Sequence, residues 1–272
     1  MARVERRRTP LPKARDVRLR LRGPIELYTW PTPNGQKVSI MLEECRLPYR
    51  VIAVNIACGD QFKPAFLKIS PNNRIPAIVD PDGPGGRPIS VFESGAILQY
   101  LGRKSGKFYP SGERQRAEVE QWLFWQMANL GPKAGEANHF RRYAAGAPQQ
   151  YAIDRFGNEL NRLFGVMNRR LADRDYLAGG YSIADMACVG WIRLFERQAG
   201  KDQAGKEQAG KERADKHRAN ELDGFRHLKR WLARVRARPA VQRGMSIRIE
   251  EASQVDVRDP KVRAVLFGQR AL

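Results

Sequence analysis

The pattern of hydrophobic and polar positions changes its period near the start of the chain. Residues 25–30 alternate as in a strand, with Ile25, Leu27 and Thr29 on one side and Glu26, Tyr28 and Trp30 on the other. From residue 38 the apolar residues recur at helical spacing, at Val38, Met41, Leu42 and Cys45. Between them lies the turn-forming segment Pro31-Thr32-Pro33-Asn34-Gly35. The pattern predicts a strand that passes through a tight turn directly into a helix.

Three further strands and a second long helix are predicted over the next 60 residues. Alternation over residues 49–56 predicts the second strand, and residues 76–80 and 88–92 form two short apolar runs separated by a Gly/Pro turn. Pro76 heads the third strand, where it cannot donate to the sheet, so the sequence predicts an unusual turn there, with a cis peptide bond as the hypothesis. A helix opens at residue 93. The order β-α-β, then β-β-α, is the thioredoxin-like α/β arrangement.

The second half of the chain is helical by its period. Helices are expected over residues 113–140, 150–171, 182–198 and 225–236, with no strand between them, which predicts an all-α C-terminal domain. Ser182 and Asp185 have the spacing of a capping box, so their expected role is folding and not catalysis.

The turn before the first helix is the candidate catalytic site. A strand that feeds a helix start directs free backbone N–H groups and the positive end of the helix dipole toward one point. Thr32 and Asn34 add a hydroxyl and an amide there, which suits donors to a thiolate. For such a segment in isolation, a simple helix cap is the favoured interpretation.

Two other segments have binding chemistry. If the bond before Pro76 is cis, the N–H and C=O of Ile75 are free to pair with a peptide-like ligand as a strand would. At the start of the next helix, Ser94 can bind a carboxylate and Glu93 can accept from an ammonium, which together suit an amino-acid head group. Helix capping is again the simpler interpretation when the segment is taken alone.

Composition narrows the chemistry. The 272 residues carry a net charge of +20. Residues 1–22 contribute nine Lys or Arg and two acidic residues. No aromatic-interleaved basic stripe or zinc finger accompanies this charge, so we expect no specific nucleic-acid partner. No apolar run approaches about 18 residues, and no secretory signal is evident, so a cytoplasmic protein without a membrane anchor is expected. The three cysteines lack metal-ligand spacing, so no metal is expected and the reactive sulfur is expected to come from a ligand.

Several segments together resemble the glutathione S-transferase family, in particular its bacterial Nu-class or Ure2-like branch of glutathione-dependent disulfide-bond oxidoreductases. They are residues 32–37, 61–62, 70–78, 92–97 and 151–156, and the resemblance covers roughly residues 25–245. It implies that Thr32 and Asn34 face the sulfur of glutathione, that Ile75 pairs with its cysteinyl part and that Glu93 with Ser94 holds its γ-glutamyl head. The same resemblance implies that Gln61, Arg74 and Arg155 secure the remaining polar groups. A surface Arg155 paired with Asp154 or Glu159 is the alternative that composition favours.

The resemblance implies a thiol:disulfide oxidoreductase that binds a glutathione pair or oxidised glutathione, with small disulfides or electrophiles as second substrates. Conjugation of glutathione to carbon electrophiles and a non-catalytic, Ure2-like binding module are the alternatives. A homodimer is also implied. The expected domains are a basic arm (1–24), the thioredoxin-like domain (25–104), a linker (105–112), the helical domain (113–245) with a low-complexity insertion (199–220), and a tail (246–272).

Overall fold

The fold begins with a four-stranded mixed sheet. The computed structural model describes residues 23–144, 149–204 and 222–269, the side chains of 197–204 excepted. The strands are β1 (Ile25–Thr29), β2 (Tyr49–Ala53), β3 (Ala77–Asp80) and β4 (Ile89–Phe92), arranged in the order β2-β1-β3-β4. β1 pairs with β2 in parallel and with β3 in antiparallel fashion, and β4 is antiparallel to β3.

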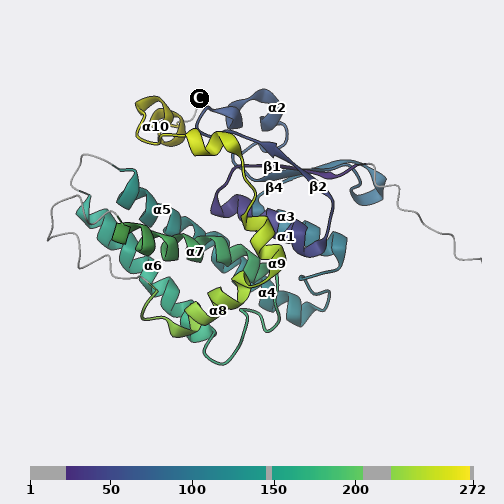
Figure 1. Ribbon diagram of the computed structural model, residues 1–272. Coiled ribbons are helices and arrows are strands. Elements are labelled where there is room, and N and C mark those ends of the chain that lie inside the picture. The colour runs from purple at the N-terminus through teal and green to yellow at the C-terminus, as the bar shows by residue number, and fades with distance from the viewer. Residues whose placement is uncertain (1–22, 145–148, 205–221, 270–272) are drawn as a thin grey trace, which may run out of the picture.

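Helices cover both faces of this sheet. Figure 1 shows α1 (Pro33–Cys45) and α3 (Ser94–Ser105) on one side of the strands and the short α2 (Pro64–Leu67) on the other. Single-turn helices η1 (Asp60–Phe62) and η2 (Pro84–Gly86) lie in the connections. The predicted thioredoxin-like fold is confirmed, and the Ile75–Pro76 peptide bond is cis, as the sequence suggested.

The remainder of the chain is helical, which confirms the second part of the predicted architecture. Its elements are α4 (Glu113–Trp125), η3 (Gln126–Leu130), α5 (Gly131–Arg142), α6 (Gln150–Arg170), α7 (Ile183–Ala204), α8 (Arg226–Arg236), α9 (Pro239–Met245), η4 (Glu250–Gln254) and α10 (Pro260–Phe267). No helix among the described residues is both long and apolar enough to cross a membrane.

The prediction of one continuous helix over residues 113–140 is wrong. A π-helical turn, η3, divides it into α4 and α5, and the N–H of Gly131 donates to the carbonyl of Gln126, five residues earlier. Pro132 explains the break, because a proline has no N–H to donate and its ring would collide with the carbonyl four residues earlier in a regular α-helix. The wider turn accommodates the proline without ending the helical path.

The predicted capping box fixes the start of the central helix α7. The N–H of Ser182 donates to Asp185 Oδ2 at 3.1 Å, and the N–H of Ala184 donates to Ser182 Oγ at 3.3 Å. Asp185 also accepts from the N–H of Leu177 and from Trp231 Nε1 on α8, at 3.1 and 2.8 Å. Burial raises the pKa of this carboxyl to about 6, although these hydrogen bonds favour its charged form. The box joins α7 to α8 and has the structural role that the sequence predicts.

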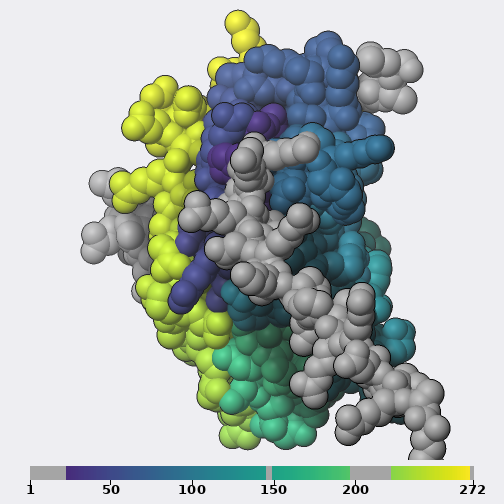
Figure 2. Space-filling view, turned by 90° about the vertical axis from the view of Figure 1, so that its right-hand side faces the viewer, coloured from purple at the N-terminus to yellow at the C-terminus, as the bar shows by residue number. Residues whose placement is uncertain are grey.

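The C-terminal segment lies on the body of the protein, along both domains (Figure 2). In α9, Gly244 packs so closely on α1 that an added Cβ would lie 2.6 Å from the Cα of Ile40. Farther on, the Phe267 ring of α10 lies 4.7 Å from the ring of His139 on α5. With the hydrogen bond from Arg74 to Gln269, the segment from α9 to residue 269 therefore contacts both halves of the molecule.

Two expected segments fall largely outside the described residues. They are the basic arm, of which only residues 23 and 24 are described, and the insertion at 199–220, of which residues 205–220 are not. Helix α7 continues to Ala204, so the backbone of the first insertion residues is helical.

Candidate functional site

The turn between β1 and α1 is fixed by its own residues. Thr32 is the N-cap of α1, and its Oγ1 accepts from the N–H of Gly35 at 3.2 Å. Gly35 has no room for a side chain, because a Cβ there would lie 2.4 Å from Thr29 Oγ1 and 2.5 Å from the Trp30 carbonyl oxygen. As a cap, the Thr32 hydroxyl uses its oxygen as the acceptor, so its hydrogen stays available to a ligand.

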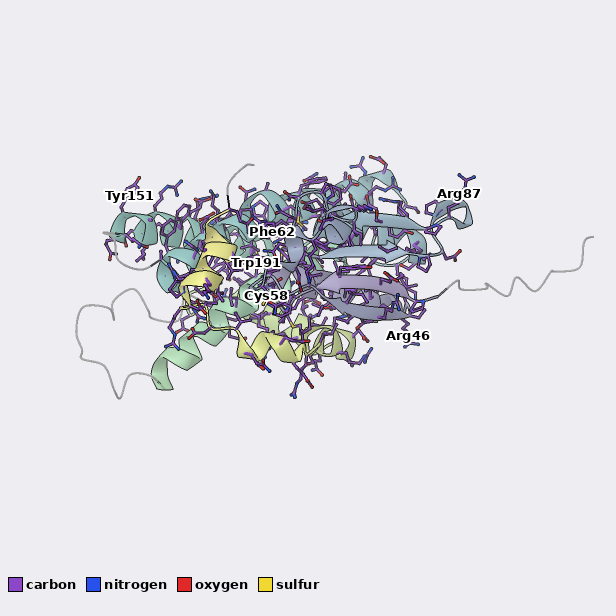
Figure 3. All side chains as sticks on the ribbon, turned by 90° about the horizontal axis from the view of Figure 1, so that it is seen from above. Arg46, Cys58, Phe62, Arg87, Tyr151 and Trp191 are labelled. Atoms are coloured by element: carbon purple, nitrogen blue, oxygen red, sulfur yellow. The ribbon has the colours of Figure 1, made fainter. Side chains whose placement is uncertain are left out.

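Asn34 is oriented by a residue of the helical domain. Trp191 on α7 donates from Nε1 to Asn34 Oδ1 at 3.1 Å. An indole N–H can only donate, so the oxygen of the amide must face Trp191 and its NH₂ group must point elsewhere. Trp191, labelled in Figure 3, lies away from the end of the sheet marked by Arg46 and Arg87. The sequence did not single out Trp191, because nothing local links it to a residue 157 positions earlier.

The start of α3 is built differently. Its N-cap, Glu93, has a positive φ angle (φ 68°, ψ 115°) and makes no side-chain capping hydrogen bond. An L-residue at positive φ is strained, and such strain often accompanies ligand-binding turns. Ser94 follows and is buried, with 6% of its surface exposed. The first N–H groups of α3 therefore have no side-chain cap, which leaves this helix start suited to an anion.

A buried lysine, which the sequence analysis did not identify, lies against Ser94. Lys37 of α1 is 2% exposed, and its Nζ lies 3.3 Å from Ser94 Oγ, 2.8 Å from Gln126 Oε1 and 3.5 Å from Met127 Sδ. Burial lowers its pKa to about 7, while Cys188 and Glu93 act in the opposite direction. Helical spacing could have indicated that Lys37 is buried, because it shares a helix face with the apolar residues Met41 and Cys45, four and eight residues later.

Ile75 and Gln61 lie on the loops beside β3 and α2. No backbone hydrogen bond joins Ile75 to another described residue, so its N–H and C=O have the freedom that the sequence analysis expected. Gln61 is 2% exposed, its Nε2 donates to the Ile56 carbonyl at 3.2 Å, and its Oε1 has no partner among the described residues. Gln61 therefore supports its own loop, and its role toward a ligand stays a prediction.

The two predicted arginines are both exposed and differ in their contacts. Arg74 Nη1 donates to Gln269 Oε1 of the tail at 2.7 Å. Arg155 on α6 forms no ion pair within the described part of the chain. The two carboxylates that the alternative assigned to it are engaged elsewhere, because Asp154 accepts from Gln150 and Glu159 pairs with Arg162. No close ion pair joins Arg155 to either carboxylate among the described residues, although its positive charge helps to lower the pKa of Glu159.

Two of the protein's three thiols are buried and poorly suited to chemistry. Cys45 and Cys188 are buried, and burial raises the pKa of both thiols. Cys58 is exposed and lies in the loop after β2. No cluster of three or more metal-binding side chains occurs among the described residues. Burial therefore disfavours a reactive thiolate at Cys45 and Cys188.

The structure thus joins the starts of α1 and α3 through the contact between Lys37 and Ser94, and it joins α1 to the helical domain through Asn34 and Trp191. Ile75 precedes β3, which lies between β1 and β4, the strands that lead into these helices. Arg74 and Arg155 lie on the surface and are not brought into contact with these groups by any described hydrogen bond.

Two family models match the chain. The N-terminal domain model of glutathione S-transferases matches residues 32–104, and the C-terminal domain model matches residues 142–239. Together they include the starts of α1 and α3 and most of the helical domain.

Known proteins agree with these models. The disulfide-bond oxidoreductase YfcG of Escherichia coli is 45% identical over 218 residues, which are 79% of this chain and 92% of that protein. A glutathione transferase from Pseudomonas putida, solved with one glutathione disulfide per subunit, is 43% identical with a TM-score of 0.71, over 82% of this chain and 91% of that one. Another, from Pseudomonas fluorescens with two glutathione bound, is 43% identical with a TM-score of 0.72, over 82% and 93%. The chain belongs to the glutathione S-transferase family.

Proposed function

We propose that this protein is a glutathione-dependent thiol:disulfide oxidoreductase. The observation that carries the proposal is the pair of hydrogen-bond donors at the start of α1, the Thr32 hydroxyl and the NH₂ group of Asn34, whose amide oxygen accepts from Trp191. Donors at a helix start stabilise a thiolate over a thiol. The names of the relatives support the same chemistry, because YfcG is a disulfide-bond oxidoreductase and the P. putida protein binds glutathione disulfide.

In this proposal, glutathione lies across the ends of the strands. Its sulfur faces Thr32 and Asn34, its cysteinyl backbone pairs with Ile75, and its γ-glutamyl head meets Glu93 and Ser94. Support comes from the unpaired backbone groups of Ile75 and from the uncapped start of α3. Gln61, Arg74 and Arg155 are proposed to hold the remaining polar groups, and the exposed guanidinium of Arg155 suits a carboxylate.

The reaction is a two-step exchange. The glutathione thiolate attacks one sulfur of a substrate disulfide, a new S–S bond forms, and the other substrate sulfur leaves as a thiolate that takes up a proton. A second glutathione thiolate then attacks the mixed disulfide, which yields glutathione disulfide and the second reduced thiol. Two glutathione molecules are oxidised for each disulfide reduced. The bound glutathione pair of the P. fluorescens relative supports a site large enough for both.

The decisive assay compares a mixed disulfide with an aryl halide under the same glutathione concentration. We expect faster turnover of the disulfide, because the site offers two hydrogen-bond donors to sulfur. Thr32→Ala should lower the rate, and Asn34→Ala should lower it at least as much, since each removes one donor to the thiolate. Faster aryl transfer would favour conjugation instead, and glutathione binding without either activity would favour a binding module.

Trp191→Phe sharpens this assay. It keeps an aromatic ring but removes the donor that orients Asn34, so we expect a rate loss of about tenfold with the affinity for glutathione little changed. A double variant Thr32→Ala/Asn34→Ala with an unchanged rate would remove the proposed catalytic site.

We also propose that the protein forms a homodimer, as the family resemblance implies. Phe124 on α4, a large apolar side chain with 60% of its surface exposed, is the position that we choose to test it. Light scattering on the wild type and on Phe124→Asp tests this, with a dimer and a shift toward monomer as the expected results. A wild-type monomer would contradict it.

A further inference from the structure

The feature with no assigned role is Lys37. A lysine with 2% of its surface exposed is rare, because removing an ammonium from water is costly unless partners replace the lost hydration. Lys37 lies on α1, and its partners come from two other elements: Ser94 opens α3, and Gln126 with Met127 opens the π-helical turn. The lysine therefore lies where the candidate ligand site meets the helical domain.

The donors and acceptors of this cluster have one arrangement that satisfies Lys37. Gln126 is fully buried and presents its Oε1 to Nζ, and its Nε2 is left without an acceptor among the described residues. The Gln126 amide therefore accepts a hydrogen bond from Lys37 through Oε1, while its Nε2 donates none to a described residue. The second oxygen within reach of Nζ is the hydroxyl of Ser94, at 3.3 Å. An ammonium has three hydrogens to donate and no lone pair, so Ser94 Oγ must act as the acceptor.

This leaves the hydrogen of the Ser94 hydroxyl to point elsewhere. The acceptor in its reach among the described residues is the thioether of Met127, at 3.7 Å, and a thioether is a weak acceptor. A carboxylate at the uncapped start of α3 would be a far stronger one. The lysine also places a positive charge behind the hydroxyl, which strengthens donation toward an anion.

We infer that Lys37 is a positioning residue that directs the Ser94 hydroxyl toward the carboxylate of a bound γ-glutamyl head group and supplies the buried countercharge for it. This inference rests on the proposed function, because that function places the head group at the start of α3. Lys37 touches no ligand in this scheme and acts through Ser94. Gln126, held by the π-helical turn, keeps the lysine in place.

The groups that face Lys37 make this arrangement sensitive to pH. Glu93 lies at the start of α3 and Cys188 on α7, and both act to raise the pKa of the lysine, while burial lowers it to about 7. Burial keeps the Cys188 thiol protonated, so Cys188 contributes no charge near neutral pH. When Lys37 loses its proton, its amine can accept from Ser94, and the hydroxyl no longer donates to the ligand. Carboxylate binding should therefore weaken as the pH rises through this range.

The test combines a protein variant with a ligand variant. Lys37→Met keeps the length of the side chain and removes its charge and donors. Its affinity is measured by calorimetry for S-methylglutathione, which has no ionisable thiol, and for the matching ligand in which 4-aminobutyrate replaces the γ-glutamyl residue and so lacks its carboxylate. We expect Lys37→Met to weaken S-methylglutathione about tenfold or more and to change the second ligand less than about twofold. Ser94→Ala should behave in the same way, and the double variant should be no weaker than Ser94→Ala alone.

Controls separate this effect from a loss of structure or of charge. Lys229→Met removes one exposed positive charge from α8 and should leave both affinities unchanged. Wild-type affinity for S-methylglutathione should fall between pH 6 and 8, and that slope should be absent in Lys37→Met. Circular dichroism and thermal unfolding check that the variant is folded, and Lys37→Gln repeats the test if Lys37→Met is not.

Each outcome bears on the inference. Equal weakening of both ligands would overturn it, because the effect would then not involve the carboxylate, and so would no change with either ligand. If the wild type binds S-methylglutathione and only the variants behave otherwise than expected, the proposed function stands and the role of Lys37 falls. If the wild type binds neither ligand, both fall.

Discussion

The two long helices of the thioredoxin-like domain each follow a strand, but they begin in opposite ways. At the start of α1, Thr32 caps its own helix and Gly35 lets the turn close tightly against Thr29. At the start of α3, the N-cap Glu93 makes no side-chain capping bond, and the serine beside it faces a buried lysine. The first start has a side-chain cap and the second has none. Similar sequence signals therefore mark a capped helix start in one place and an uncapped helix start in the other.

The largest expected effect is on the free energy of unfolding, and it tests how tightly each of the two helix starts is packed. Gly35→Ala should lower the free energy of unfolding by about 3 kcal/mol, because the added Cβ meets Thr29 Oγ1 and a backbone carbonyl that cannot move away. The matched change Gly95→Ala in α3 should cost less, about 1 kcal/mol, because its Cβ meets only the side chain of Met127, at 3.1 to 3.4 Å, and no backbone atom. Urea denaturation of both variants measures the difference. Equal losses would show that the two turns are packed alike.

The next effect concerns the lysine that connects the two helix starts. The unfolded chain keeps the proton of Lys37 up to its ordinary pKa of 10.5, whereas the folded protein releases it above about 7. Between these values the unfolded state binds more protons, so the stability of the wild type rises with pH by up to about 1.4 kcal/mol per unit from this group. Lys37→Met lacks this contribution.

We therefore expect the stability of the wild type, measured relative to Lys37→Met, to increase by about 2 kcal/mol between pH 7 and 9. Urea denaturation of both proteins across that range gives the difference, from which the titration of Cys188 and of the tyrosines cancels. A difference that is independent of pH would mean that Lys37 keeps its proton throughout.

A smaller effect distinguishes the polar side chains of the two turns. Thr32→Ala should lower the free energy of unfolding by about 1 kcal/mol, because it removes the N-cap of α1, and should leave glutathione affinity nearly unchanged. Ser94→Ala removes no cap and should show its main effect in affinity. Denaturation and calorimetry on the same preparations provide both readings. If Ser94→Ala lowers the free energy of unfolding more than Thr32→Ala does, the contrast between a capped and an uncapped helix start is contradicted.

The smallest expected effect lies far from both turns. Deletion of residues 201–216, which include two of the Ala-Gly-Lys repeats, should leave glutathione affinity unchanged, because the repeats contain no residue assigned to the site. Calorimetry on the shortened chain tests this, with the full chain as control. A weakened affinity would assign the insertion a part in binding.

Local patterns predicted most of the fold. The alternation in β1, the helical spacing in α1 and the capping box at Ser182 are signals confined to a few residues, and each corresponds to the observed element. The continuous helix over 113–140 failed because a proline inside a helical pattern leaves open whether the helix ends, kinks or widens. Periodicity reports which face is apolar, but it does not report such a change of winding.

The site was predicted less completely, for a different reason. Thr32, Asn34, Glu93 and Ser94 lie in helix-start segments that can be recognised locally, whereas Lys37 and Trp191 depend on contacts over 57 to 157 positions in sequence. A lysine on an amphipathic helix is ordinarily assigned to solvent. Only the packing of α1 against the π-helical turn reveals that this one is enclosed.

The bond between Lys37 and Gln126 has a consequence for protein engineering. Chimeras that exchange the N-terminal half of this chain with that of a relative would separate the ammonium from the amide that accepts its hydrogen bond. Crossovers placed between residues 105 and 112 should therefore succeed only when the incoming half carries at position 37 a residue that Gln126 can satisfy, so positions 37 and 126 must be exchanged together.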